Sequence, residues 1–482
     1  MSGNATGDGL RVRRDVQSLL AEGDSGRRVL DQYAAGIEAM RARDPDDGGD
    51  PTDPLSWRFQ AAIHGFPGVT PSIDHPNRWG SCRHNSWFFL PWHRMYLLFF
   101  ERIVRSHVGD DSWALPYWDY TKTGDESSRV LPEPFRSPTA GNPLFTDQRD
   151  PDVNSETDPM PLRSSWAGAI GALEEETFAL APASAITSFG GGAIRDAIPG
   201  PSARGSLERK PHGLVHGNVG GESGWMWTFE TAGLDPIFWL HHCNLDRLWD
   251  VWISMYGADM LPAHPAWTET EFEFFDVDGS RTAMAVGDVL SSADLGYAYE
   301  SIEPPEGTLV PERRDVVPAS VEEEEPHADL AGAAPDVDLS SRASVGVDIS
   351  AAPAPAVEPA EAGGRPLRWF LRVEDVTGTR PATPAYDVYL NVPDDAAVDE
   401  HEERMVGSIA TFGIPEATAP EAEHGGIGIT DVFEITDVVN RLQEREEWDP
   451  TTVTVTIVPA DPRGAVEGGG DVRAGRVSVY TR

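Results

Sequence analysis

The sequence contains almost no lysine and almost no cysteine. Lysine occurs only at Lys122 and Lys210, and cysteine only at Cys82 and Cys243. Two cysteines cannot supply a disulfide framework, so stability does not rest on one. With 79 acidic residues against 38 Lys and Arg, the 482-residue chain has a formal net charge of -41. Because such an acidic surface repels phosphate backbones and anionic lipids, we expect no nucleic-acid partner and no membrane partner.

The sequence also lacks an apolar run long enough to span a membrane. Its opening segment, MSGNATGDGLRVRRDVQ, has arginines without an apolar stretch behind them, which is not the pattern of a secretory signal. A cytoplasmic location is therefore the default expectation. With 40% hydrophobic residues, a chain of this length is expected to form two domains rather than one core.

Composition divides the chain into three regions. Residues 1–302 hold nearly all the tryptophan, and apolar residues recur there at helical spacing, which predicts a helical bundle. Residues 303–365 are rich in Pro, Ala, Glu and Asp, which predicts a flexible acidic linker. Residues 366–482 contain short runs with alternating side chains, such as YDVYLNV, which predict an antiparallel β-sandwich. The expected fold class is a mainly α domain followed by a β-sandwich domain.

Six histidines lie on or beside four of the predicted helices. Burying this many neutral imidazoles in one core without a metal would leave polar atoms that are costly to satisfy. Ligation by imidazole without carboxylates suits copper or zinc, and none of the six has the Glu-x-x-His spacing of a di-iron bundle. We therefore expect two copper ions, with zinc as the poorer alternative. The two sets of three are His64, His84 and His93, and His212, His216 and His242.

Helical geometry limits how these histidines can meet. His212 and His216 are four residues apart and share one helical face. His84 and His93 would point to opposite sides of an unbroken helix. Pro91 is therefore predicted to begin the helix, which leaves His84 in the preceding loop and His93 in the first turn.

A further histidine is adjacent to one member of the second set. His241 and His242 diverge by about 100° on a helix, so only one of them can face the same site. The apolar stripe that includes Phe238 and Trp249 favours His242 as the inward residue and leaves His241 beside the site. A second apolar stripe runs near His241, so the alternative stays open.

Several segments resemble a known family. HNSWFFLPWHRMYLLFFE and DPIFWLHHCNLD look like the two signature motifs of tyrosinases, catechol oxidases and haemocyanins, the proteins with a binuclear copper site. The resemblance covers most of residues 50–255. It implies two copper ions that use O2 to oxidise o-diphenols to o-quinones. In the family's second motif the later histidine of the pair is the ligand, which agrees with His242.

The C-terminal region resembles part of the same family. YDVYLNV, VGSIATFGIP, GITDVFE and VTVTIVP look like the C-terminal domain of plant-type polyphenol oxidases, and they occur in the same order. In those proteins the domain shields the copper site in a latent form. A lid over the active site is therefore one interpretation of residues 366–482, and a plain stabilising domain is the other.

The resemblance also assigns roles to residues near the copper pair. Cys82 lies two residues before His84, where fungal and molluscan members carry a thioether crosslink, although a buried free thiol is the alternative. Glu208 matches a glutamate that holds a water near the site. Phe229 matches a bulky gate residue, or is plain core. Gly213 replaces an asparagine that is thought to assist monophenol hydroxylation, so that activity is left open.

The remaining expectations concern the surroundings of the site. Asp246 resembles a buried carboxylate that orients a ligand imidazole, with a salt bridge between helices as the alternative. The expected partners are O2 and small phenols, and a copper-delivery protein is left open. An o-aminophenol oxidase on the same dicopper site is the first rival function, and haemocyanin-like oxygen binding is the second.

Overall fold

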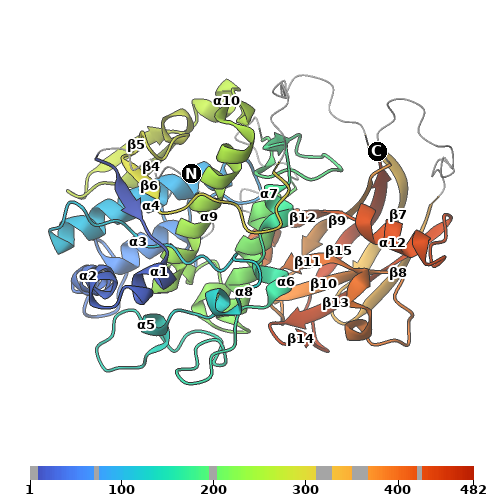
Figure 1. Ribbon diagram of the computed structural model, residues 1–482, viewed down its shortest axis with the longest axis horizontal. Helices are drawn as coiled ribbons and strands as arrows, with labels where there is room; N and C mark the ends of the chain where they lie inside the picture. Colours follow the sequence, from blue (N-terminus) through green and yellow to red (C-terminus); the bar gives the residue numbers. More distant parts are fainter. Residues whose placement is uncertain (1–8, 70–74, 195–202, 311–327, 350–366, 421–425) are drawn as a thin grey trace.

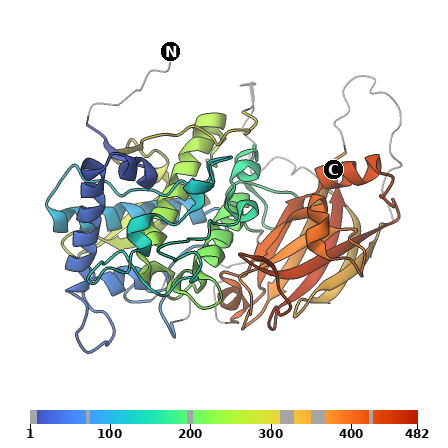
Figure 2. The ribbon, with the colours of Figure 1, turned by 60° about the horizontal axis from the view of Figure 1, so that its bottom comes forward.

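A helical part and a β-sheet part lie side by side in the computed structural model (Figures 1 and 2). The predicted fold class, mainly α followed by a β-sandwich, is confirmed. None of the helices in the described ranges has the length and hydropathy that crossing a bilayer requires. The structure describes residues 9–69, 75–194, 203–310, 328–349, 367–420 and 426–482.

Four helices carry most of the core of the helical part. The central one, which ends at Tyr256, is buried on nearly all sides, as its unbroken apolar sequence predicts. Its start is fixed by Asp235, whose side chain accepts a hydrogen bond from the Ile237 backbone amide, and by proline at its first position. The four are α2 (Asp24–Arg41), α3 (Trp57–His64), α4 (Phe89–Val108) and α9 (Pro236–Tyr256).

The start of α4 differs from the prediction. The helix begins at Phe89 rather than Pro91, and Leu90 is helical. Proline is tolerated there because the first turn of a helix has no acceptor for its backbone amides, so the missing N–H costs nothing. His84 nevertheless lies in the loop before the helix, and His93 lies within its second turn.

Short elements complete the helical part. A π-helical segment, Glu208–Gly213, leads directly into α8. The short helices are α1 (Val16–Ala21), α5 (Glu133–Arg136), α6 (Ser164–Ala167), α7 (Ile170–Leu173), α8 (Leu214–Gly220) and α10 (Pro265–Thr268). The short strands are β1 (Arg11–Arg13), β2 (Ala179–Leu180), β3 (Gly191–Gly192), β4 (Glu271–Phe275), β5 (Arg281–Ala285) and β6 (Tyr297–Tyr299).

Two antiparallel sheets form the C-terminal part. One has the order β11–β10–β13, with β14 and β8 both pairing with β13, and the other has the order β12–β9–β15–β7. The strands are β7 (Asp329–Asp338), β8 (Ala343–Asp348), β9 (Trp369–Thr377), β10 (Ala385–Leu390), β11 (Met405–Ala410), β12 (Ile429–Glu434), β13 (Thr452–Asp461), β14 (Gly464–Ala465) and β15 (Arg473–Thr481). Two short helices, α11 (Ile414–Thr418) and α12 (Thr436–Glu444), accompany them.

The predicted linker, residues 303–365, is wrong in its middle part. Strands β7 and β8 lie inside it, so the sandwich begins at Asp329 rather than near residue 366. Among the described strands, β7 pairs only with β15 and β8 only with β13. Such edge positions tolerate the Ala, Gly, Asp and Pro335 that made the segment read as a linker. The rest of the linker prediction falls largely on residues 311–327 and 350–366, which lie outside the described residues.

Candidate metal centre

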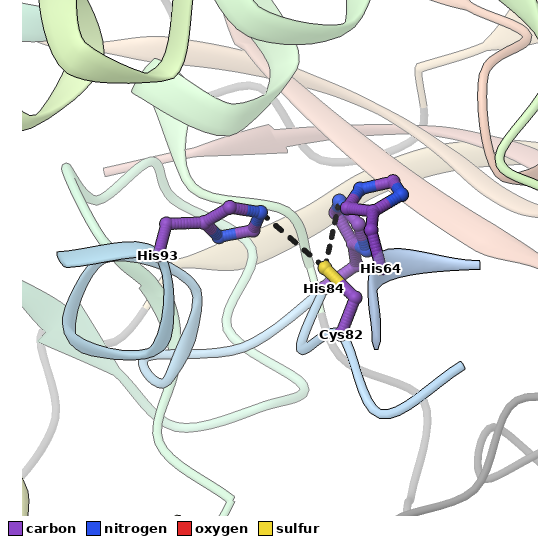
Figure 3. Close-up of side chains that lie close together, drawn as sticks. All are labelled: His64, Cys82, His84 and His93. Carbon is purple, nitrogen blue, oxygen red and sulfur yellow. Dashed lines mark hydrogen bonds between the residues drawn. The ribbon is translucent and has the colours of Figure 1, made fainter. Parts of the chain in front are cut away.

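Two groups of side chains with metal-ligating atoms lie in the middle of the helical part. Within each group, one candidate ligand atom per residue lies within 4.8 Å of the others. Both predicted sets of three histidines are therefore brought together, and each gains one further residue. The groups are His64, Cys82, His84 and His93 (Figure 3), and His212, His216, His241 and His242.

Backbone carbonyls orient two of the imidazoles of the first group. The His64 Nδ1 lies 3.0 Å from the Phe229 carbonyl oxygen, and the His93 Nδ1 lies 2.8 Å from that of Phe89. A ring nitrogen facing a carbonyl carries the proton, so Nε2 of each ring keeps its lone pair free. The His64 Nε2 is buried and has no hydrogen-bond partner among the described residues.

Two imidazoles of the second group are oriented in the same way. The His212 Nδ1 lies 3.1 Å from the Glu208 carbonyl oxygen, and the His216 Nδ1 lies 2.7 Å from that of Met226. The His212 Nε2 is buried without a partner in the described part of the chain. The His216 and His242 Nε2 atoms lie 3.4 Å apart.

The two groups face each other. The rings of His93 and His242 stack with their centres 4.3 Å apart and their planes 5° from parallel. His84 and His212 form a second contact between the two groups, with ring centres 5.4 Å apart. Two metal ions held by these groups would therefore be neighbours, as a two-metal reaction requires.

The environment keeps the imidazoles neutral. Burial lowers the pKa of His64 to about 3, and it lowers the pKa of His93 and His216 well below the usual value. A neutral imidazole is the form that binds a metal. The free lone pairs of these imidazoles lie close together. Imidazole nitrogen is a ligand that suits copper, so the residues present suit a copper pair.

Burial alone does not separate His241 from His242, since both are fully buried. The Tyr120 hydroxyl lies 2.8 Å from the His241 Nδ1, and the His241 Nε2 is buried without a partner among the described residues. The sequence predicted that His241 lies beside the site. In the structure its ring is close enough to the other histidines of the second group to bind the same metal ion. Tyr120 lies in the motif LPYWDY, but the sequence alone did not reveal its contact with His241.

Cys82 lies between two imidazoles of the first group. Its sulfur is 3.9 Å from the His84 Nε2 and 3.3 Å from the His93 Nε2 (Figure 3). The predicted crosslink to His84 would form one C–S bond, with loss of the thiol hydrogen and one ring hydrogen and transfer of two electrons to O2.

We expect the copper-loaded protein, after exposure to O2, to have an intact mass two hydrogens below the sequence mass. The crosslink fixes the ring of the one ligand that lies outside a helix, which is its physical advantage. Cys82→Ser should restore the full mass, whereas Cys243→Ser should not. An unchanged mass in the copper-loaded wild-type protein would identify Cys82 as a free thiol.

Two residues assigned by resemblance also lie near the histidines. Burial raises the pKa of Glu208 to about 8; its Oε1 accepts a hydrogen bond from the Asn85 amide at 2.7 Å, and its Oε2 is buried without a partner in the described chain. The ring of Phe229 lies 4.6 Å from that of His64 and 5.1 Å from that of His84. Phe229 therefore covers the first group.

Asp246 does not have the role that the resemblance suggested. Its carboxylate accepts hydrogen bonds from Arg13 at 3.1 Å and from the hydroxyls of Tyr297 at 2.6 Å and Tyr299 at 2.5 Å, and it pairs with Arg94. No imidazole is among its contacts in the described residues. The alternative, a salt bridge between elements, therefore describes Asp246: it joins α9 to α4, β1 and β6.

A residue of the C-terminal part reaches the metal centre. The ring of Phe412 stacks on that of His216, with centres 3.9 Å apart, and lies 5.6 Å from that of His212 and 5.9 Å from that of His84. The side chain is 4% exposed. Phe412 follows β11 in the segment VGSIATFGIP, nearly 200 residues beyond His216 in the sequence, and no spacing pattern could have revealed the contact.

Comparisons with known proteins agree with this geometry. The model of the common central domain of tyrosinase matches residues 54–255, and that of the polyphenol oxidase middle domain matches residues 262–306. A domain of unknown function matches residues 327–482, which supports the early start of the sandwich. The chain is 32% identical to a tyrosinase of Hahella sp. (strain CCB-MM4), over 98% of this chain and 99% of that protein.

More distant relatives include plant enzymes. A chloroplastic polyphenol oxidase of Malus domestica is 27% identical over 91% of this chain and 74% of its own length. The solved structure of latent apple tyrosinase covers 98% of this chain and 97% of its own, with a TM-score of 0.63 and 24% identity. That structure has the same fold, with both the helical part and the C-terminal part represented.

These relatives correct the expected cytoplasmic location. The polyphenol oxidases of Malus domestica and Vicia faba and catechol oxidase B of Solanum tuberosum are chloroplastic. The acidic composition and the opening segment of the sequence do not identify the compartment in which a protein works. The cytoplasmic prediction was therefore wrong.

Identity over nearly the full length of the Hahella tyrosinase, together with the match of the central domain, establishes the relationship. The chain therefore belongs to the tyrosinase family and is a copper oxidoreductase, a phenol oxidase with two copper ions at its active site.

Proposed function

We propose that the protein oxidises o-diphenols to o-quinones with O2, and that the six predicted histidines hold the copper pair. The observation that carries this proposal is the pair of facing groups of imidazoles. In four of them Nδ1 lies against a backbone carbonyl, which leaves Nε2 free to bind a metal: His64, His93, His212 and His216. Each diphenol gives up two electrons and two protons. Two diphenols therefore reduce one O2 to two waters, and the copper pair supplies the electron transfer.

One feature of this chain favours diphenols over monophenols. Hydroxylation of a monophenol needs a base that takes the phenolic proton. Gly213 offers no side-chain amide beside Glu208 to help position a water as that base. Oxidation of a diphenol has no such requirement, because catechols lose protons more readily.

Oxygen uptake by the copper-loaded protein tests the proposal directly. Catechol, a monophenol and o-aminophenol are supplied in parallel, and copper per chain is measured on the same samples. We expect about two copper ions per chain, consistent with a two-metal site, and two quinones formed per O2 from catechol. Faster turnover of o-aminophenol would make the protein an aminophenol oxidase. Reversible O2 binding without quinone would indicate an oxygen carrier.

We also propose that the C-terminal domain is a lid over the copper site, and that its boundary lies between residues 303 and 328. Phe412 supports this interpretation, because its ring occupies the space above His216 where an aromatic substrate would lie. A Cβ on Gly213 would lie only 2.8 Å from that of Ala410, so the lid also fills the space beside the site.

Polar contacts hold the proposed lid in place. Arg204 pairs with Asp431 through two hydrogen bonds, of 2.6 and 2.8 Å, with both residues buried. The Trp227 indole donates to the Thr411 hydroxyl at 3.0 Å. Interfaces between domains that separate are typically polar in this way.

The lid is expected to loosen as the pH rises. Burial and the nearby Glu230 raise the pKa of Glu416, on the lid helix α11, from 4.5 to about 7. The closed state therefore holds this proton more tightly than the open state does. Between pH 6 and pH 8 the ratio of open to closed protein should rise about tenfold through this group.

The ratio of full-length to lid-trimmed activity on catechol measures this change, because the pH dependence of the chemistry cancels. Glu416→Gln should remove about tenfold of the rise between pH 6 and pH 8. An unchanged rise in the glutamine variant would mean that Glu416 does not control the lid.

A further inference from the structure

A cavity lies between the two domains, and none of the histidines of the metal centre lines it. It has a volume of about 270 Å³. Its walls come from the catalytic domain, around α7 and the π-helical segment, and from the sandwich, around β11 and β12. Figure 1 labels α7, β11 and β12 where the two domains meet. Both Lys210, one of the two lysines of the chain, and its neighbour Arg209 line it.

Neither of the two cations has a direct acidic partner among the described residues. In the described part of the chain, the side chains of Arg209 and Lys210 form no hydrogen bond and no ion pair, and both are partly buried. The Arg209 guanidinium stacks on Phe433, 4.5 Å from the ring centre, which leaves its N–H groups to face the cavity or solvent. Burial lowers the pKa of Arg209, and the attraction of Asp431 and Glu175 offsets only part of that shift.

The carboxylates around the cavity are engaged elsewhere or exposed. Glu434 pairs with Arg368. Glu175 accepts a hydrogen bond from the Ser206 hydroxyl at 3.3 Å, and burial raises its pKa to about 7, so its negative charge is only partial at neutral pH and decreases as the pH falls. Glu174 accepts from a backbone amide, and Asp437 is exposed at the rim.

We propose that this cavity is a binding site for a small oxyanion, either a phosphate or a carboxylate. Arg209 would bind it through its planar guanidinium, and Lys210 would add a second charge-assisted hydrogen bond. A volume of about 270 Å³ accommodates an anion of this size with water around it.

Occupation of the site has a consequence that rests on the proposed lid. Because Arg368 and Phe433 belong to the sandwich and Arg209 and Lys210 to the catalytic domain, the complete cavity exists only when the lid is closed. A ligand that binds one state only shifts the equilibrium towards that state. The anion is therefore an inhibitor that strengthens latency without touching the copper ions.

Calorimetric titration of the full-length protein with inorganic phosphate, and separately with citrate, tests the site. Saturable binding of one anion per chain is expected, with the stronger of the two identifying the ligand chemistry. Arg209→Gln and Lys210→Gln should each weaken binding by about tenfold or more, the worth of one charge-assisted hydrogen bond. Lys210→Arg should retain it, and so should Arg27→Gln, which changes an exposed arginine far from the cavity. Chloride at equal ionic strength should not replace either anion.

Two outcomes would contradict the proposed anion site. One is equal binding by the wild-type protein and the Arg209→Gln and Lys210→Gln variants, and the other is no saturable binding. A second measurement addresses the lid alone. The bound anion should lower catechol oxidation by the full-length chain and leave the lid-trimmed chain unaffected. Saturable binding with no effect on the full-length chain would overturn the coupling while leaving the site in place. Neither result depends on which phenol the enzyme prefers.

Discussion

Replacing His242 by glutamine is expected to lower kcat/KM for catechol by more than about a hundredfold. A loss of about a hundredfold is the largest effect typical of mutating a residue that only hydrogen-bonds to a metal ligand, and loss of a ligand itself should cost more. The protein should retain one copper ion rather than two. The reason is position: the His242 ring stacks on His93 and approaches His216, so it lies where the two histidine groups meet. Metal analysis and oxygen uptake on the same sample measure both effects.

The neighbouring His241 provides the matched control. Its Nδ1 lies against the Tyr120 hydroxyl, a contact that a glutamine side chain can also make. His241→Gln should therefore keep both copper ions and stay within about tenfold of wild-type activity, below the cost of a lost ligand. If His241→Gln loses a copper ion and His242→Gln keeps both, the assignment of the ligand must be reversed.

The sequence was most informative where chemistry and helical geometry act together. His212 and His216 at a spacing of four, and the aromatic helix that carries His242, predicted which imidazoles would converge. Pro91 correctly separated His84 from His93, although the helix begins two residues earlier because a first turn tolerates proline.

The sequence was least informative where a contact joins distant segments. β7 was assigned to the linker because an edge strand needs neither β-branched residues nor alternation, and its pairing with β15 compensates for its composition. Asp246 has the same sequence context whether it orients a ligand or pairs with Arg94. Phe412 could not be placed over His216, because only the docking of one domain on the other creates that contact.

The largest gain in activity is expected from Phe412→Ala. Its ring is only 3.9 Å from that of His216, so a phenol cannot stack there while the lid is closed. Removing the ring should raise the rate of catechol oxidation by the full-length chain at least about tenfold. This corresponds to a loss of about 1.4 kcal/mol of the free energy by which the lid blocks the substrate. A protease cut between the domains, followed by loss of the lid, should raise activity at least as far.

A general loosening of the lid would raise activity too, so a control is needed. Leu442→Ala truncates a side chain that is 2% exposed in the core of the sandwich, away from the copper site. It should lower the stability of that domain by about 2–5 kcal/mol without opening the space above His216. If Leu442→Ala activates as strongly as Phe412→Ala, the ring does not block the site. Equal turnover of catechol by trimmed and full-length protein would leave the C-terminal domain with a stabilising role alone.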